Sequence, residues 1–102
     1  MASKRTNTSF GDSWRDLFKQ KGWTQKSVAV EAGIDPSFFS KALRSKDYKR
    51  LNAEWVARIS QMAGLPRDYF PEVREAAVLD AIRADPKIRD RLFDELKLGS
   101  RT

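Results

Sequence analysis

Four polar side chains between residues 37 and 44 fall on one face of a predicted helix and are suited to contacting nucleic-acid bases. They are Ser37, Ser40, Lys41 and Arg44, spaced at i, i+3, i+4 and i+7. Lys41 and Arg44 can donate hydrogen bonds to N7 and O6 of guanine, whereas the two serine hydroxyls are short and less selective. We therefore expect all four to contact DNA bases, and Arg44 can equally bind a phosphate.

A second set of residues around this helix is suited to the sugar-phosphate backbone. Gln25 has a donor and an acceptor at the start of the preceding helix, beside backbone N–H groups that can bind a phosphate. Residues 44 to 51, RSKDYKRL, form a basic loop, and residues 1–10 form a basic arm; a solvated loop and a frayed terminus are the alternatives. The expected backbone contacts are Thr24, Gln25, Lys46, Tyr48, Lys49, Arg50, Asn52, Lys4 and Arg5.

The positive charge is concentrated in the same two regions. The chain has a formal net charge of +6, of which residues 1–23 and 34–50 carry +3 each, while the remaining stretches are neutral. An excess charge with no polyanion to meet would be scattered over the surface. The charge distribution therefore favours a side that faces phosphate.

Two short helices joined by a tight turn are predicted to position these residues. Thr24 can cap the first helix and Gly33 can end it, after which Asp35 caps the second and Pro36 suits its first position. Their inward faces are Val28, Ala29 and Ala32, then Phe39, Ala42 and Leu43. Small residues at the crossing permit a helix-turn-helix, in which the second helix can enter the DNA major groove.

This stretch resembles the lambda repressor and Cro-like (XRE) helix-turn-helix family. The motif residues, in that family's order and spacing, are Gln25, Ala29, Gly33, Ile34, Phe39 and Ser40, and the resemblance covers roughly residues 14–70. It implies an all-α, five-helix DNA-binding domain in which Gln25 binds the DNA backbone and braces the recognition helix. Ser45 departs from the family, because a glycine often ends this helix there.

Three further helices complete the domain expected over residues 11–70. The first runs from about residue 12 or 13 to Lys21, and the fourth follows an Asn52 cap and closes at Gly64. Pro66 is expected to open a short fifth helix. The aromatic residues expected in this core are Trp14, Phe18, Trp23, Phe39, Trp55, Tyr69 and Phe70. Phe38 either packs at the core edge or touches a thymine methyl group.

Residues 71–102 are expected to form a C-terminal helical extension with no net charge. Asp85 and Pro86 restart or kink its helix, and Gly99 ends it. Its apolar stripe either folds back on its own domain or pairs with a second subunit, which suits a motif that reads two half-sites. The predicted dimerisation residues are Val78, Ile82, Ile88, Leu92, Phe93 and Leu96.

The composition argues against several other classes of protein. The chain has 102 residues with no cysteine and no histidine, so thiolate, imidazole and the usual zinc chemistry lack their residues. No apolar run approaches the roughly 20 residues of a membrane helix, and the N-terminus lacks the apolar core of a secretory signal. We therefore expect a cytoplasmic protein that is not an enzyme and needs no metal or other cofactor.

These features together favour a sequence-specific double-stranded DNA-binding transcriptional regulator. Its simplest form is a repressor that binds an inverted-repeat operator as a homodimer through the helix at residues 36–44. One alternative is an antitoxin-like protein-interaction module, which binds a protein partner through its C-terminal helices and autoregulates its promoter. Another is an architectural protein that binds DNA without sequence preference.

Overall fold

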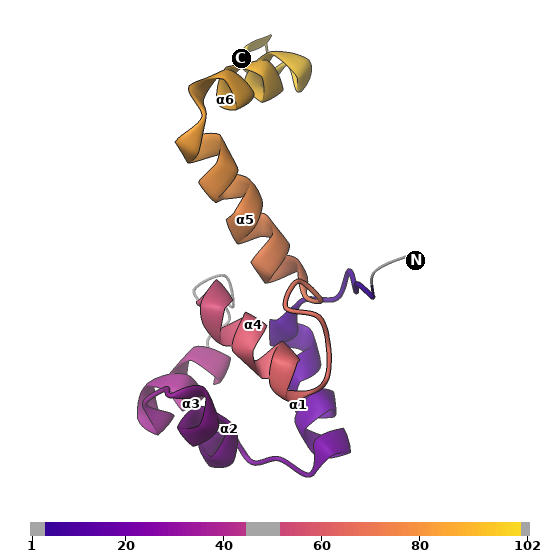
Figure 1. Cartoon of the computed structure of the whole chain (residues 1–102), viewed down its shortest axis with the longest axis vertical. Coiled ribbons are helices and arrows are strands. Elements are labelled where there is room, and N and C mark those ends of the chain that lie inside the picture. Colours follow the sequence, from indigo (N-terminus) through magenta and orange to yellow (C-terminus); the bar gives the residue numbers. More distant parts are fainter. Residues whose placement is uncertain (1–3, 45–51, 101–102) are drawn as a thin grey trace.

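The computed structural model describes residues 4–44 and 52–100, and within these ranges the chain contains helices and turns only (Figure 1). The helices are α1 (Phe10–Lys21), α2 (Gln25–Ala32), α3 (Pro36–Arg44), α4 (Ala53–Met62), α5 (Pro71–Ala84) and α6 (Pro86–Glu95), followed by a 3-10 turn, η2 (Leu98–Ser100). The all-α fold class is therefore confirmed. The molecule is elongated, measuring 48 × 34 × 22 Å.

Side-chain caps set the boundaries of α2 and α3. Thr24 Oγ1 accepts a hydrogen bond from Ser27 N at 3.0 Å, and Ser27 Oγ accepts one from Thr24 N at 3.1 Å. Gly33 ends α2 with a φ of 73°, and Asp35 Oδ1 accepts from Phe38 N at 2.9 Å in the first turn of α3. The predicted caps are confirmed, while the reciprocal role of Ser27 was not predicted.

The first helix begins earlier than the sequence suggested. It starts at Phe10 because Ser9 Oγ accepts from Asp12 N at 3.1 Å, while the Glu72 carboxylate accepts from Phe10 N and Gly11 N. Phe10 is fully buried, although it was not expected in the core. The other end is as predicted, since Gly22 has a φ of 70°.

The core lies between α1, α2, α3 and α4 and is rich in aromatic rings. Its members are Phe10, Trp14, Phe18, Val28, Ala29, Ala32, Ile34, Phe39, Leu43, Val56, Ile59 and Phe70, with Trp23 and Trp55 partly buried against them. Phe38 packs edge-on against Trp55, with ring centroids 5.5 Å apart. Packing at the core edge is thus confirmed for Phe38, and 59% of the residue stays exposed.

The prediction of a short fifth helix after Pro66 is wrong. Residues 66–70 form turns, in which Tyr69 N donates to Pro66 O at 3.1 Å. The Arg74 guanidinium donates hydrogen bonds to the carbonyl oxygens of Asp68 and Tyr69, at 2.7 and 2.8 Å. These bonds hold the segment as a turn, and the next helix, α5, starts only at Pro71.

The C-terminal extension does not fold back over the core. Figure 1 shows α5 leaving the α1–α4 unit and carrying α6 at its far end. The break between them is as predicted, because Asp85 Oδ1 accepts from Lys87 N at 3.0 Å and Pro86 occupies the first position of α6. The predicted end of α6 is wrong: the helix stops at Glu95, and Lys97 takes a positive φ of 54° before Gly99 is reached.

Candidate nucleic-acid interface

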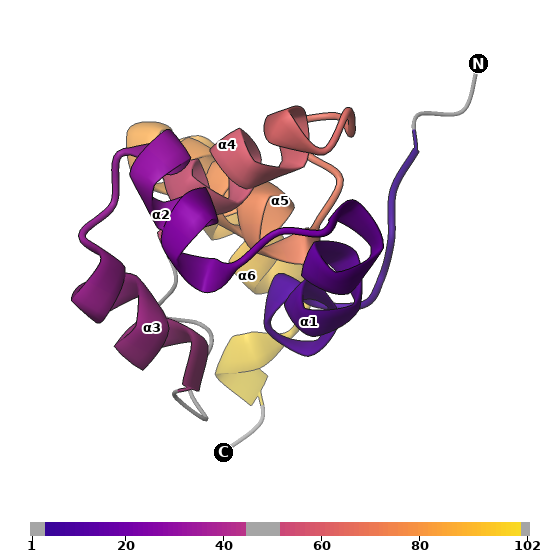
Figure 2. The ribbon, with the colours of Figure 1, turned by 90° about the horizontal axis from the view of Figure 1, so that it is seen from below.

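A tight turn between α2 and α3 sets the angle at which α3 is presented (Figure 2). Ile34 N donates to Ala29 O at 2.8 Å, and Gly33 N donates to Val30 O at 3.2 Å. Ala29 and Ala32 are buried, so the two helices approach closely where no bulky side chain intervenes. Arg58 of α4 donates from Nη1 to Ala32 O at 3.0 Å, which satisfies a carbonyl at the end of α2.

The two faces of α3 differ as the sequence predicted. Phe39 and Leu43 point into the core, with 0% and 6% exposure. Ser37, Lys41 and Arg44 are exposed, and Ser40 is partly buried. Within the part of the chain that the structure describes, the polar and basic face of α3 is therefore exposed.

A shallow, open depression joins this face to the beginning of α2. Its volume is about 390 Å³, and it is lined by Gln25, Lys26, Pro36, Ser37, Ser40, Lys41 and Arg44. The structure thus brings Gln25 together with all four predicted base-contacting residues. Lys26 belongs to the same surface but was not among the predicted DNA contacts. Its basic side chain beside Gln25, in the first turn of α2, is the sequence feature that could have indicated its place on this surface.

A hydrogen bond within α3 orients one of the basic side chains. Arg44 donates from Nη2 to Ser40 Oγ at 2.8 Å and from Nε to Ser40 O at 3.4 Å. The guanidinium therefore lies back along the helix against Ser40, which also lines the depression. A guanidinium has five N–H donors, so further donors remain for a base or phosphate.

Two of the predicted backbone contacts also act as helix caps. Thr24 Oγ1 caps α2, and Asn52 Oδ1 accepts from Glu54 N at 2.8 Å at the start of α4. Capping uses their acceptor oxygens and leaves the Thr24 hydroxyl hydrogen and the Asn52 amide donors available. Four other predicted backbone contacts, Lys46, Tyr48, Lys49 and Arg50, lie outside the described residues.

The N-terminal arm is not part of this surface. Figures 1 and 2 both place the segment before α1 on the side of α1 away from α3. Thr6 N donates to Tyr69 O at 3.0 Å, and Arg5 Nη2 lies 3.8 Å from Asp68 Oδ2. The structure therefore does not bring Lys4 and Arg5 together with the other predicted DNA contacts.

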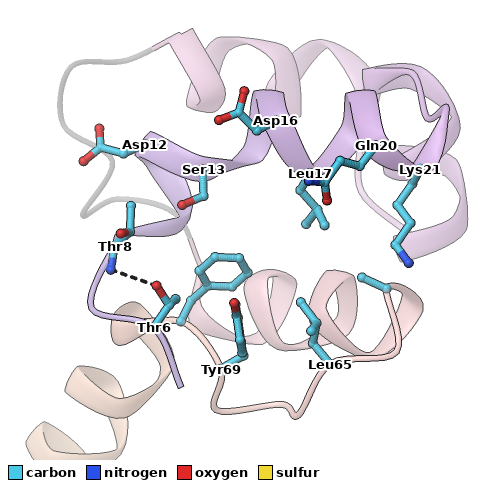
Figure 3. A pocket seen from close by; sticks show the side chains of 12 residues that line it. Thr6, Thr8, Asp12, Ser13, Asp16, Leu17, Gln20, Lys21, Leu65 and Tyr69 are labelled. Carbon is cyan, nitrogen blue, oxygen red and sulfur yellow. Dashed lines mark hydrogen bonds between the residues drawn. The ribbon is translucent and has the colours of Figure 1, made fainter. Parts of the chain in front are cut away.

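A groove beside this arm is lined by both polar and apolar residues (Figure 3). Its volume is about 450 Å³, and its walls come from the arm, α1 and the loop after α4. Thr8 N donates to Thr6 Oγ1 at 3.1 Å along one wall, and Asp12 and Asp16 of α1 line another. No group of acidic residues in the described part of the chain could hold a metal ion.

Apolar side chains are left uncovered on α5, α6 and η2. Among the predicted dimerisation residues, Val78, Phe93 and Leu96 are 49–58% exposed, whereas Ile82, Ile88 and Leu92 are partly buried. Leu79 and Leu98 are similarly exposed and were not predicted. Val78 and Leu79 also line an open groove of about 450 Å³ on α5. We call Val78, Leu79, Phe93, Leu96 and Leu98 the apolar arm surface.

Comparisons of the chain with protein-family models, curated proteins and solved structures found no match. Over the described ranges, no helix has both the length and the apolar character needed to cross a membrane.

Proposed function

We propose that this chain is a sequence-specific double-stranded DNA-binding transcriptional regulator of the lambda repressor/Cro-like type. In this proposal α3 enters the major groove, and Lys41, Arg44, Ser37 and Ser40 contact base edges. The observation that carries it is the single open surface formed by the polar face of α3 and the basic start of α2. Of the five helices expected over residues 11–70, the proposal rests on α1–α4.

The beginning of α2 is suited to a phosphate beside the groove. The first backbone N–H groups of a helix have no intrahelical partner and carry partial positive charge. Gln25 and Lys26 add side-chain donors at the same place. Contacts of this kind give affinity for any DNA sequence and fix the register of α3, while the α3 side chains supply discrimination.

The apolar arm surface supports a homodimer that reads an inverted repeat. Its five residues are each about half exposed. Completing the burial of five such side chains on both protomers contributes at most about 7 to 15 kcal/mol. Association itself costs about 4 to 15 kcal/mol, so the free dimer is weak and DNA binding strengthens it. A dimer on an operator would repress by blocking promoter access, in the cytoplasm and with no cofactor.

Selection from random duplexes tests this proposal. Duplexes bound by the full-length protein are recovered and sequenced over several rounds, in parallel with a Lys41→Ala variant and an exposed α6 control, Lys87→Ala. We expect the wild type and the control to enrich one inverted repeat, and Lys41→Ala to lose preference at one base position in each half-site. Recovery of unrelated sequences by the wild type would instead support a non-specific architectural protein.

The apolar arm surface also supports a second candidate, an antitoxin-like module. In that case α5 and α6 bind a different protein, and the α2–α3 surface controls the module's own promoter. A neighbouring gene for a small toxin-like protein, whose product forms a stoichiometric complex with this chain, would favour this candidate. A concentration-dependent homodimer without any such partner would favour the first.

A further inference from the structure

A buried carboxylate from α5 caps the beginning of α1. Glu72 is 9% exposed, and its two oxygens accept from Phe10 N at 2.7 and 3.0 Å and from Gly11 N at 3.3 Å. A negative charge is favourable at this end of a helix, and hydrogen bonds to a charged acceptor are stronger than neutral ones. Glu72 therefore ties α5 to a helix more than 60 residues earlier in the chain.

An arginine two residues further along α5 holds two other segments. Arg74 Nη1 donates to Asp68 O at 2.7 Å and to Tyr69 O at 2.8 Å, and Nη2 donates to Thr6 O at 2.7 Å. The planar guanidinium fork fixes the directions of all three bonds. Arg74 thus connects α5 to the preceding turn and to the N-terminal arm.

These contacts all come from the first turn and a half of α5, while the rest of the helix projects away from the core (Figure 1). With 14 residues, α5 is about 21 Å long. A tilt of about 15° at its base would move its far end by about 5 Å, which exceeds the rise of about 3.4 Å per DNA base pair. The orientation of α5 at its base therefore decides where α6 lies relative to α3.

We propose that Glu72 and Arg74 are positioning residues that fix α5 relative to α3 and so determine which half-site spacing a dimer accepts. The inference rests on the proposed function, because it requires α5 and α6 to join two copies on DNA. Neither residue touches the α2–α3 surface. Their effect is on spacing selectivity and not on recognition of a single half-site.

A distance measurement tests the anchoring without DNA. The chain has no cysteine, so spin labels can be placed selectively at Lys26→Cys in α2 and Ala84→Cys at the end of α5, both exposed positions. Labelled protein is diluted with unlabelled protein so that only distances within one chain are measured. We expect a narrow distribution of label-to-label distances in the chain that carries only the two labels, and in two α5 controls, Glu75→Gln and Arg83→Ala. Glu72→Gln and Arg74→Ala should each broaden this distribution.

A spacing measurement tests the consequence. Duplexes carry the selected half-site twice, with the spacer changed one base pair at a time, and single half-sites are titrated alongside. We expect Arg74→Ala to bind a single half-site as tightly as the wild type does. Its affinity ratio between the best spacing and the other spacings should fall about tenfold, because a less constrained α5 lets the dimer bind the other spacings. Circular dichroism establishes folding, and Arg74→Ala carries the test if Glu72→Gln does not fold.

The two measurements separate the inference from the function on which it rests. The positioning role is overturned if the spin-label distance distribution stays narrow in both Glu72→Gln and Arg74→Ala. It is also overturned if the spacing preference of Arg74→Ala equals that of the wild type. A wild type that prefers no spacing contradicts the proposed dimeric operator binding and the spacing role together. In that case the spin-label distances still decide whether Glu72 and Arg74 hold α5 in place.

Discussion

Removing the Glu72 carboxylate should destabilise the whole fold, because this side chain serves the buried start of α1. In a Glu72→Ala variant, Phe10 N and Gly11 N lose their acceptor, and Phe10 is itself fully buried. Ser9 Oγ still caps Asp12 N, so the helix keeps one of its caps. The effect therefore comes from two unsatisfied backbone donors and from the loss of a negative charge at the helix N-terminus.

The expected magnitude follows from those contacts. A buried donor left unsatisfied costs about 1 to 3 kcal/mol, and the charge at the helix N-terminus adds about 0.3 to 1 kcal/mol. Gly11 is only partly buried, and an open groove lined by Ser9 and Glu72 lets water reach this end of α1. We therefore expect a loss of about 2 to 3 kcal/mol, equivalent to a fall of about 8 to 24 °C in Tm for a domain of this size.

Urea unfolding followed by tryptophan fluorescence measures this loss, since Trp14 lies in α1 and is buried in the core. The matched control is Glu75→Ala, an exposed glutamate on the same helix, for which we expect a change within about 0.5 kcal/mol. If Glu72→Ala were as stable as Glu75→Ala, the reasoning would be refuted, because the carboxylate would then make no net contribution at α1.

Three other substitutions have defined expected outcomes. Lys41→Ala should weaken operator binding by about 1 to 3 kcal/mol and affect random DNA less, as measured by fluorescence anisotropy. Gly33→Ala should lower stability by about 1 to 2 kcal/mol in thermal unfolding, since residue 33 has a φ of 73°. Leu96→Asp should shift the dimer to monomer in sedimentation experiments on the complex with operator DNA, while the fold is kept. The control is Val30→Asp, a change at an apolar residue of α2 that is 64% exposed.

For each of these substitutions, one result would contradict the prediction. Equal losses on operator and random DNA would assign Lys41 to the phosphate backbone instead of a base. A Gly33→Ala protein as stable as the wild type would mean that the turn tolerates a side chain in the left-handed conformation. A Leu96→Asp protein that dimerises like Val30→Asp would remove the apolar arm surface from the dimer interface.

Much of the α2–α3 unit could be predicted because its signals are local. Thr24, Gly33 and Asp35 act on backbone groups within a few residues, so their types and positions are enough to place the helix ends. The alternation of Phe39 and Leu43 with polar residues likewise places one face of α3 inside and the other outside. The candidate surface follows directly from those two predictions.

The features that were missed depend on contacts between distant parts of the chain. Nothing near Phe10 indicates that Glu72 caps its helix, and nothing near Pro66 indicates that Arg74 holds the following residues as a turn. The position of the N-terminal arm depends on Thr6 and Tyr69, which are more than 60 residues apart. Sequence periodicity also could not give the direction in which α5 leaves the core, because the start of α5 contacts segments that are distant in the sequence.

The most direct test of the account is the affinity of the full-length protein for its best selected duplex and for a scrambled duplex of equal composition, at two salt concentrations. We expect the selected inverted repeat to bind at least about a thousandfold more tightly, with salt weakening both complexes. Equal affinity for the two duplexes, lost together as salt rises, would contradict sequence-specific recognition by α3 and leave only electrostatic attraction.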